Sequence, residues 1–349
     1  MAYTTINKPS NYFDTKLYTG TGATNSITGL NFSPDFVWIK VRSNATHGHN
    51  LFDVIRGVNK NLQTNGTASE GDDTSGSLTA FNSDGFTLGG FYNKVNQSGE
   101  TFVSWNWDAN GAGVSNNSGT ITSTVSANTT SGFSIVSYTG NGTSGATFGH
   151  GLGVAPAFTI VKNRSLGGRN WQGFHKSLGN TKSHLLNSTE VPRTNIVFWN
   201  NTSPTSTLIT LGNDADVNES GQSFIAYCFA EVKGFSKFGS YTGNGSTDGT
   251  FVYTGFKPAM IIIKQTNTSG GQWYMYDSVR NTFNLTDKQL FPNLTNAEST
   301  GNNQFDFYSN GFKARSSNTD TNGSGGTYIY MAFAENPLVG TNNVPATAR

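Results

Sequence analysis

The sequence has little cysteine, and this shortage narrows the choice of protein class. Cys228 is the single cysteine among 349 residues, so no disulfide can form within the chain. A secreted animal β-sandwich would often carry such a bridge, whereas a protein made in a bacterial cytoplasm and released by cell lysis would not. We therefore expect synthesis in the cytoplasm of a bacterial host.

Charge is also scarce, with 12% charged residues and a formal net charge of +1. A nucleic-acid-binding protein needs clustered lysine and arginine to displace counterions. The densest basic stretch, Lys162–Arg169, is interrupted by glycine and asparagine. Long apolar runs are missing too, and the first nine residues lack the apolar core of a signal peptide. We expect neither a nucleic-acid partner nor membrane insertion.

What the sequence does contain is glycine, asparagine, serine, threonine and aromatic residues. There are 42 Gly, 25 Phe and 13 Tyr, and no stretch keeps apolar residues at helical spacing for three turns. Disorder is the competing interpretation of so polar a chain, but disordered chains are poor in aromatic and β-branched residues. The composition predicts an all-β protein.

Internal repetition is the strongest pattern in the chain. Three stretches open with a Tyr-Thr-Gly triplet, at Tyr18, Tyr138 and Tyr241. In each copy a later strand follows a proline and ends near a lysine, namely Lys40, Lys162 and Lys264. Each copy then closes on an apolar strand, at 102–107, 224–229 and 328–333. We infer three copies of one unit.

The closing strands alternate between a large face and a small face, which indicates strands buried on at least one side. The large face carries Val103, Trp105 and Trp107 in the first copy and Ile225, Tyr227 and Phe229 in the second. The small face includes Ala226, Cys228 and Ala230. Nearly equal spacings from the opening tyrosine, 87, 89 and 89 residues, align Trp105, Tyr227 and Tyr330 of the three copies.

These patterns predict three tandem antiparallel β-sandwich repeats of about 100 residues, jelly-roll or lectin-like in type. In the second copy we expect eight short strands, one of them at 195–199. The expected division is repeat 1 at 1–112, a polar linker at 113–131, repeat 2 at 132–233, repeat 3 at 234–340 and a C-terminal arm at 341–349. A protease should therefore cut first within 110–131.

Four segments of the first copy carry a family resemblance: Pro34–Arg42, His49–Gly57, Phe81–Gly89 and Ser98–Trp107. They resemble bacteriophage virion proteins, mostly from viruses of marine bacteria and cyanobacteria, with concanavalin-like sandwiches. The resemblance covers the first copy well and the third in part. The second departs from it, because His175 and Leu178 stand where the others have Asp and Arg.

The resemblance implies a virion structural protein, a tail fibre or a head decoration on the virion surface, in contact with other virion proteins and with host glycans. A homotrimer is expected, because three-fold packing would bury edge strands that otherwise invite aggregation. A free carbohydrate-binding lectin is the alternative function, and a glycan-cleaving enzyme is the least favoured. No cofactor is expected.

Two acid–base pairs recur at the same spacing, Asp53 with Arg56 and Asp277 with Arg280. Each can form a buried bidentate ion pair that fixes a loop, or it can hold a sugar hydroxyl. Trp171 and Trp273 occupy the same place in their copies, where the first copy has His49. An exposed indole there would stack on a sugar ring, and packing at the sandwich edge is the alternative.

His47 and His49 are the only close histidine pair. Such a pair on a strand can chelate a metal, while two polar loop residues beside Gly48 are the simpler interpretation. Glutamates are sparse and scattered, which does not suit a glycosidase that needs two carboxylates facing one cleft. The sequence also lacks a Gly-x-Ser-x-Gly motif, so we expect no enzymatic activity.

Overall fold

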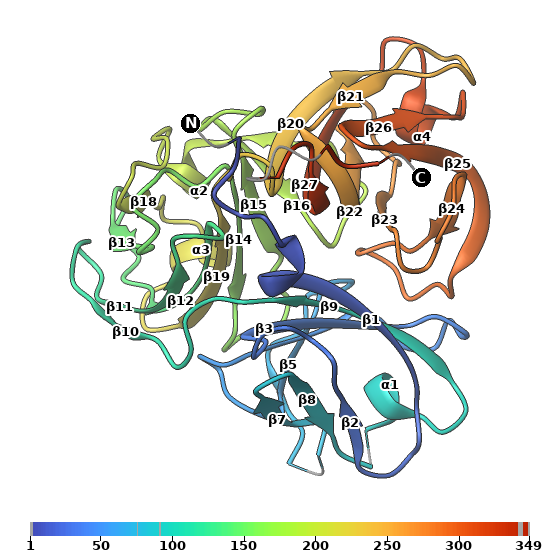
Figure 1. The fold of residues 1–349 in the computed structure, drawn as a ribbon. Helices are drawn as coiled ribbons and strands as arrows, with labels where there is room; N and C mark the ends of the chain where they lie inside the picture. The colour runs from blue at the N-terminus through green and yellow to red at the C-terminus, as the bar shows by residue number, and fades with distance from the viewer. Residues whose placement is uncertain (1–2, 75, 91, 341–344, 348–349) are drawn as a thin grey trace.

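A computed structural model describes residues 3–74, 76–90, 92–340 and 345–347. The prediction of an all-β protein is confirmed, because antiparallel sheets dominate and the helices within these ranges are single turns. Three lobes follow one another along the chain, as the blue, green and orange parts of Figure 1 show. We call them unit 1 (residues 13–107), unit 2 (114–229) and unit 3 (236–337).

Each unit has an inner sheet with the same order of its four central strands. In unit 1 the order is β1 (Phe13–Thr19), β9 (Thr101–Trp107), β3 (Phe36–Val41), β4 (Asn50–Asp53), β5 (Lys60–Gln63) and β6 (Gly71–Asp72). In unit 2 it is β10 (Val114–Asn116), β11 (Ser123–Asn128), β12 (Phe133–Thr139), β19 (Ser223–Phe229), β14 (Phe158–Asn163), β15 (Trp171–His175), β16 (Lys182–Leu185) and β17 (Arg193–Thr194). In unit 3 it is β20 (Ser236–Thr242), β27 (Thr327–Pro337), β22 (Phe256–Gln265) and β23 (Trp273–Asp277).

A smaller outer sheet belongs to each unit. The outer strands are β2 (Asn25–Ile27), β8 (Gly85–Leu88) and β7 (Leu78–Asn82) in unit 1, β13 (Thr147–Gly149) and β18 (Leu208–Thr210) in unit 2, and β21 (Phe251–Tyr253), β26 (Gly311–Ala314), β25 (Ser299–Tyr308) and β24 (Thr286–Gln289) in unit 3. The short helices are η1 (Pro9–Asn11), α1 (Asn93–Asn96), α2 (Ile196–Trp199), α3 (Ala215–Asn218) and α4 (Thr319–Asn322).

The repeated Tyr-Thr-Gly triplet has a structural cause. The tyrosine hydroxyl of each unit donates a hydrogen bond to a carbonyl in the single-turn helix before the closing strand. The bonds are Tyr18 to Val95 at 2.8 Å, Tyr138 to Val217 at 2.6 Å and Tyr241 to Thr321 at 2.6 Å. The bond satisfies a phenol that would be costly to bury without a partner.

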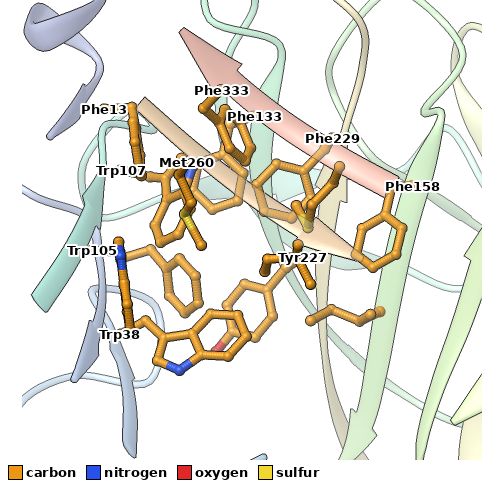
Figure 2. Close-up of a cluster of buried hydrophobic side chains, with 14 of the residues drawn as sticks. Phe13, Trp38, Trp105, Trp107, Phe133, Phe158, Tyr227, Phe229, Met260 and Phe333 are labelled. Carbon is orange, nitrogen blue, oxygen red and sulfur yellow. The ribbon is translucent and has the colours of Figure 1, made fainter. Parts of the chain in front are cut away.

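The large faces of the three closing strands point toward one another and form a single core shared by all three units. Figure 2 shows side chains from units 1, 2 and 3 meeting in this cluster, among them Trp105, Tyr227 and Phe333. The small faces line a separate core inside each unit, between its inner and outer sheets. Every closing strand is therefore buried on both sides.

The alignment of Tyr330 with Trp105 and Tyr227 is wrong by one residue. Trp105 pairs with Trp38 and Tyr227 pairs with Ile160, and the residue that pairs with the equivalent Ile262 is Met331. Met331 faces the shared core, whereas Tyr330 faces the interior of unit 3. A shift of one residue moves a strand's side chain to the opposite face.

The segment expected to be a linker, 113–131, contains two strands instead. β11 pairs with β12 from Ser123↔Tyr138 to Asn128↔Phe133, and β10 pairs with β11. Ile121 and Val125 supply the buried apolar side chains of this polar segment, at 7% and 3% exposed, whereas Val114 is 71% exposed. The segment thus extends the inner sheet of unit 2 and covers the edge of β12.

The equivalent edges of units 1 and 3 are closed differently. Within the described residues β1 pairs only with β9, and β20 pairs only with β27. At the same position of each strand, a backbone N–H donates a hydrogen bond to a carboxylate. Thr15 N donates to Asp14 Oδ1 at 2.8 Å, and Phe238 N donates to Glu231 Oε1 at 2.9 Å. Charged side chains on edge strands are a common protection against unwanted strand pairing.

The shared core also changes the expected domain organisation. Residues 1–112 were expected to stand apart from a rigid pair formed by the other two repeats, but unit 1 contributes Phe13, Trp105 and Trp107 to the same core.

Residues 341–344 and 348–349 of the expected C-terminal arm lie outside the described residues. Of the rest, Pro345 bridges Val339, and Ala346 N donates to Leu338 O at 2.9 Å.

Candidate functional site

The predicted pair Asp53–Arg56 is a buried ion pair at the end of β4. Asp53 is the last residue of that strand, and its Oδ1 accepts a hydrogen bond from Arg56 N at 2.9 Å, which closes the turn. Arg56 Nε lies 2.5 Å from Asp53 Oδ2, and both side chains are fully buried. Arg56 also donates to the Leu51 carbonyl at 2.8 Å and to Glu70 at 3.2 Å. The guanidinium is thus surrounded by acceptors.

This network crosses from unit 1 to unit 2. Tyr227 of β19 donates its hydroxyl to Asp53 Oδ2 at 2.7 Å. Arg164 forms a bidentate pair with Glu70, with both N–O distances at 2.9 Å. Bidentate arginine–carboxylate pairs fix geometry as well as charge. The network therefore fixes how the two units sit against each other.

The pair Asp277–Arg280 repeats the arrangement between unit 3 and unit 1. Arg280 Nε lies 2.5 Å from Asp277 Oδ2, again with both side chains fully buried. Trp105 Nε1 donates to Asp277 Oδ2 at 3.1 Å, in the place that Tyr227 takes at the other interface. Arg42 forms a bidentate pair with Glu298, at 2.7 and 2.9 Å. Asp277 and Arg280 therefore join two units, as Asp53 and Arg56 do.

The interface between units 2 and 3 is uncharged at the equivalent place. His175 stands at the aspartate position, and its Nε2 lies 3.2 Å from the Tyr330 carbonyl oxygen of unit 3. Burial lowers the pKa of His175 to about 4, so the ring is neutral at pH 7. Leu178 takes the arginine position and packs against the shared core. Here a neutral ring and an apolar side chain replace an ion pair.

Trp171 and Trp273 do not lie at the surface. They are 0% and 2% exposed. The indole of Trp171 donates to the Gln63 carbonyl of unit 1, and that of Trp273 to the Leu185 carbonyl of unit 2, both at 2.9 Å. The prediction that they stack on a sugar is therefore wrong, because each indole is enclosed between two units.

His49 completes this set of equivalent positions, and it is not a surface metal ligand. Its ring is 0% exposed, and its Nδ1 accepts a hydrogen bond from Trp38 Nε1 at 2.8 Å. Burial lowers the pKa of His49 well below its usual value, nearby Lys40 adds to this, and the Phe291 backbone of unit 3 opposes it. Half-buried His47 lies outside this core. No group of three potential metal-binding side chains occurs among the described residues.

The three equivalent lysines are buried beside the unit boundaries. Lys162 Nζ donates to the Thr67 carbonyl of unit 1, and Lys264 Nζ to the Thr189 carbonyl of unit 2, both at 3.2 Å. Lys40 donates to the Val41 carbonyl at 2.6 Å. Burial lowers the pKa of Lys40 to about 7 and that of Lys162 and Lys264 to about 8. These groups hold backbone oxygens in place.

Sequence reasoning missed the outer half of the ion networks, Arg42 with Glu298 and Arg164 with Glu70. Arg42 and Arg164 each stand two residues after the repeated lysine, which is a usable signal. The glutamates are harder to align, because Glu70 follows Asp53 by 17 residues and Glu298 follows Asp277 by 21. Because the intervening loops differ in length, the spacing in the sequence does not match the two glutamates, and only the structure shows that they are equivalent.

A small void lies at the centre of the shared core and is lined only by apolar and aromatic side chains, including Trp38, Phe158 and Ile262. Its volume of about 10 Å³ leaves room for at most one water molecule. The void is too small for an organic ligand.

Within the described residues no helix is long and apolar enough to cross a membrane.

Fold and site together define an all-β protein in which the conspicuous polar and aromatic groups hold three units around one core. The chain belongs to the family described as domain of unknown function DUF7483, whose model matches residues 8–337. One family model thus spans all three units. No curated protein and no solved structure matches the chain.

Proposed function

We propose that this protein is a structural component of a bacteriophage virion, either a tail fibre or a head decoration on the virion surface. The resemblance of Pro34–Arg42 and Ser98–Trp107 to virion proteins supports this proposal. We also propose that the three units are copies of one jelly-roll or lectin-like sandwich. The common order of their inner strands supports that relationship.

A single observation carries the structural role. The buried acid–base pairs, which in another protein could serve catalysis, connect units to each other. Asp53 accepts from Tyr227 of unit 2, and Asp277 accepts from Trp105 of unit 1. Buried groups with satisfied hydrogen bonds make a unique and rigid arrangement. Rigidity of this kind suits a building block of a particle, and we propose no enzymatic activity.

The homotrimer remains a prediction, and its grounds have changed. It was expected because open sandwich edges need cover. In this fold the units bury their large faces on each other within one chain. A trimer would therefore have to form through other surfaces. Contacts with further virion proteins and with host glycans are likewise proposals.

Localisation on the particle tests the proposal. Antibodies raised against the purified chain would be applied to purified virions of a phage whose genome encodes it, and detected by immunogold electron microscopy. Labels along the tail support a fibre, and labels over the capsid support a decoration. Intact virions that carry neither the label nor the chain by mass spectrometry contradict the proposal.

A further inference from the structure

Unit 3 exposes aromatic rings on the solvent side of its outer sheet. Phe251 and Tyr253 of β21 are 44% and 54% exposed. They stand two residues apart, so their side chains leave the same face of the strand about 7 Å from each other. The Phe251 ring lies 5.9 Å from the ring of half-buried Tyr308 on β25, at 75°. These three rings form what we call the aromatic platform, on the lobe at the upper right of Figure 1.

The corresponding sheet of unit 1 has no such rings. Phe251 pairs with Lys313, and the equivalent residue of unit 1 is Ser26, which pairs with Thr87. Tyr253 pairs with Gly311, and its equivalent is Thr28, which lies beside Gly85. The residue equivalent to Tyr308 is Asn82, which pairs with Gly85 as Tyr308 pairs with Gly311. The fold itself therefore does not require aromatic side chains at these three positions.

The end of the Phe251 ring lies next to Gly311. A Cβ atom at Gly311 would lie 3.1 Å from Cζ of Phe251, and 2.1 Å from the Val252 carbonyl oxygen. The Phe251 ring therefore reaches over Gly311, where the strand presents no side chain. A flat apolar ring with hydroxyl-bearing neighbours suits a ligand that has both an apolar face and many hydroxyl groups.

The charges beside the platform are paired among themselves. Lys313 Nζ lies 2.5 Å from Asp248 Oδ1, and Arg315 Nε lies 3.3 Å from Asp306 Oδ2. Asp306 also accepts from the Tyr308 hydroxyl at 3.2 Å. Two acids and two bases leave no net charge, so this surface gives no electrostatic advantage to a nucleic acid or another polyanion. Its paired donors and acceptors can still bind hydroxyl groups.

We propose that the aromatic platform of unit 3 binds a neutral polysaccharide, whose sugar rings stack on Phe251, Tyr253 and Tyr308. The charged pairs Lys313–Asp248 and Arg315–Asp306 border the stacked sugars and bond their hydroxyls. The site is shallow and open, so it takes an internal stretch of a chain rather than only its end. This inference deepens the proposed function by naming a surface and a ligand class.

Native electrophoresis in gels that contain dextran, mannan or a linear β-glucan tests the proposal with the full-length chain. The decisive variant combines Phe251→Ser, Tyr253→Thr and Tyr308→Asn, the residues that unit 1 carries at these positions. The matched control is Ile196→Ser, which removes an apolar side chain that is 52% exposed in unit 2. Thermal unfolding checks that each variant is folded.

We expect at least one of the polysaccharides to retard the natural chain, the triple variant to migrate freely, and Ile196→Ser to behave like the natural chain. Each ring lost should weaken binding roughly threefold to tenfold. Phe251→Tyr, which keeps a ring, should retain binding and shows that the ring and not the strand is responsible. Retardation should persist at high salt, because the ligand is neutral.

Three results would overturn the proposal: no retardation in any of the gels, equal retardation of a folded triple variant, or a natural chain that self-associates through the platform while the triple variant stays monomeric. The last result would assign the surface to a second copy of the chain. A negative binding result would not change the outcome of virion labelling, and a negative labelling result would not change the outcome of the binding experiment. The two proposals are therefore tested independently.

Discussion

Trp105 of unit 1 donates its indole hydrogen to the buried Asp277 carboxylate of unit 3, with 3.1 Å between Nε1 and Oδ2. Tyr227 of unit 2 donates to Asp53 of unit 1 in the same way, at 2.7 Å. Two different donors thus fill one role at equivalent places. A donor on a large ring stands at this position where the facing turn holds an ion pair, whereas Met331 stands there in unit 3. The ion pair, and not the fold alone, therefore requires the donor, and the donor links the shared core to the ion networks.

Removing one of these carboxylates should destabilise the protein strongly. Asp277→Ala leaves the buried Arg280 with Glu298 as its one ion-pair partner among the described residues, so we expect a loss of about 3 kcal/mol in the free energy of unfolding. Urea unfolding followed by circular dichroism measures it. Glu190→Gln, at a largely exposed ion pair, is the control and should cost at most about 1 kcal/mol.

Replacing both members of the pair should cost less than removing one. The double variant Asp277→His with Arg280→Leu gives unit 3 the residues that unit 2 has at His175 and Leu178. Since a buried ion pair can be exchanged for neutral groups at little cost, we expect it to be more stable than Asp277→Ala. A double variant less stable than the single one would show that the charges themselves are needed.

The buried tryptophans should act as core residues. Trp273→Ala removes an indole that is 2% exposed and should cost about 3–5 kcal/mol in urea unfolding. Phe283→Ala is the matched control, because its ring is 77% exposed, and it should change the unfolding free energy by less than about 0.5 kcal/mol. Equal stabilities of the two variants would contradict the placement of Trp273 between units.

Stability should rise with pH between about 7 and 9 because of the buried lysines. Burial lowers the pKa of Lys162 to about 8, while in the unfolded chain it returns to about 10.5, so in this window the unfolded state binds more protons than the native state. The melting temperature should therefore increase with pH. Lys162→Met should flatten the slope, whereas Lys182→Met, at an exposed side chain, should leave it unchanged.

Unfolding should be a single transition that involves all three units. Each contributes to the shared core, so none keeps its buried surface when another leaves. Tryptophan fluorescence and far-ultraviolet circular dichroism should give the same urea midpoint. A fragment of residues 132–233 should show no cooperative transition. Separate midpoints, or a fragment that folds alone, would return the units to the status of independent domains.

Cys228 offers a probe for the same event. Its side chain is 0% exposed, and burial raises the pKa of the thiol to about 12, so the thiolate is scarce in the folded protein. A thiol reagent should react with it only after global unfolding, at the rate measured by fluorescence. Rapid labelling of the native chain would show that unit 2 opens on its own.

The sequence predicts the β class, the three-part repetition and the recurring ion pairs, because these depend on local composition and spacing. Asp53 with Arg56 and Asp277 with Arg280 are close in sequence and form one turn each. It does not predict what Trp171 and Trp273 face. Alternation within one strand says which residues share a face, and it does not say whether water or another unit covers that face.

Two local predictions fail for identifiable reasons. The stretch expected as a strand at 195–199 holds the single-turn helix α2, because the Asn195 side chain accepts from Val197 N at 3.2 Å and caps it. The polar segment 113–131 pairs with β12, because Val125 fills the core of unit 2 while β-branched Thr124 faces solvent. Polarity alone does not distinguish a linker from a covering strand.

The direction of the contacts between units has a consequence for how this architecture can evolve. Trp171 of unit 2 reaches unit 1, Trp273 of unit 3 reaches unit 2, and His49 of unit 1 lies against unit 3. The contacts close on themselves, so there is no first or last unit at which another could be added. An open array can gain or lose copies by recombination, whereas a closed circle of three can vary only in its loops and outer faces.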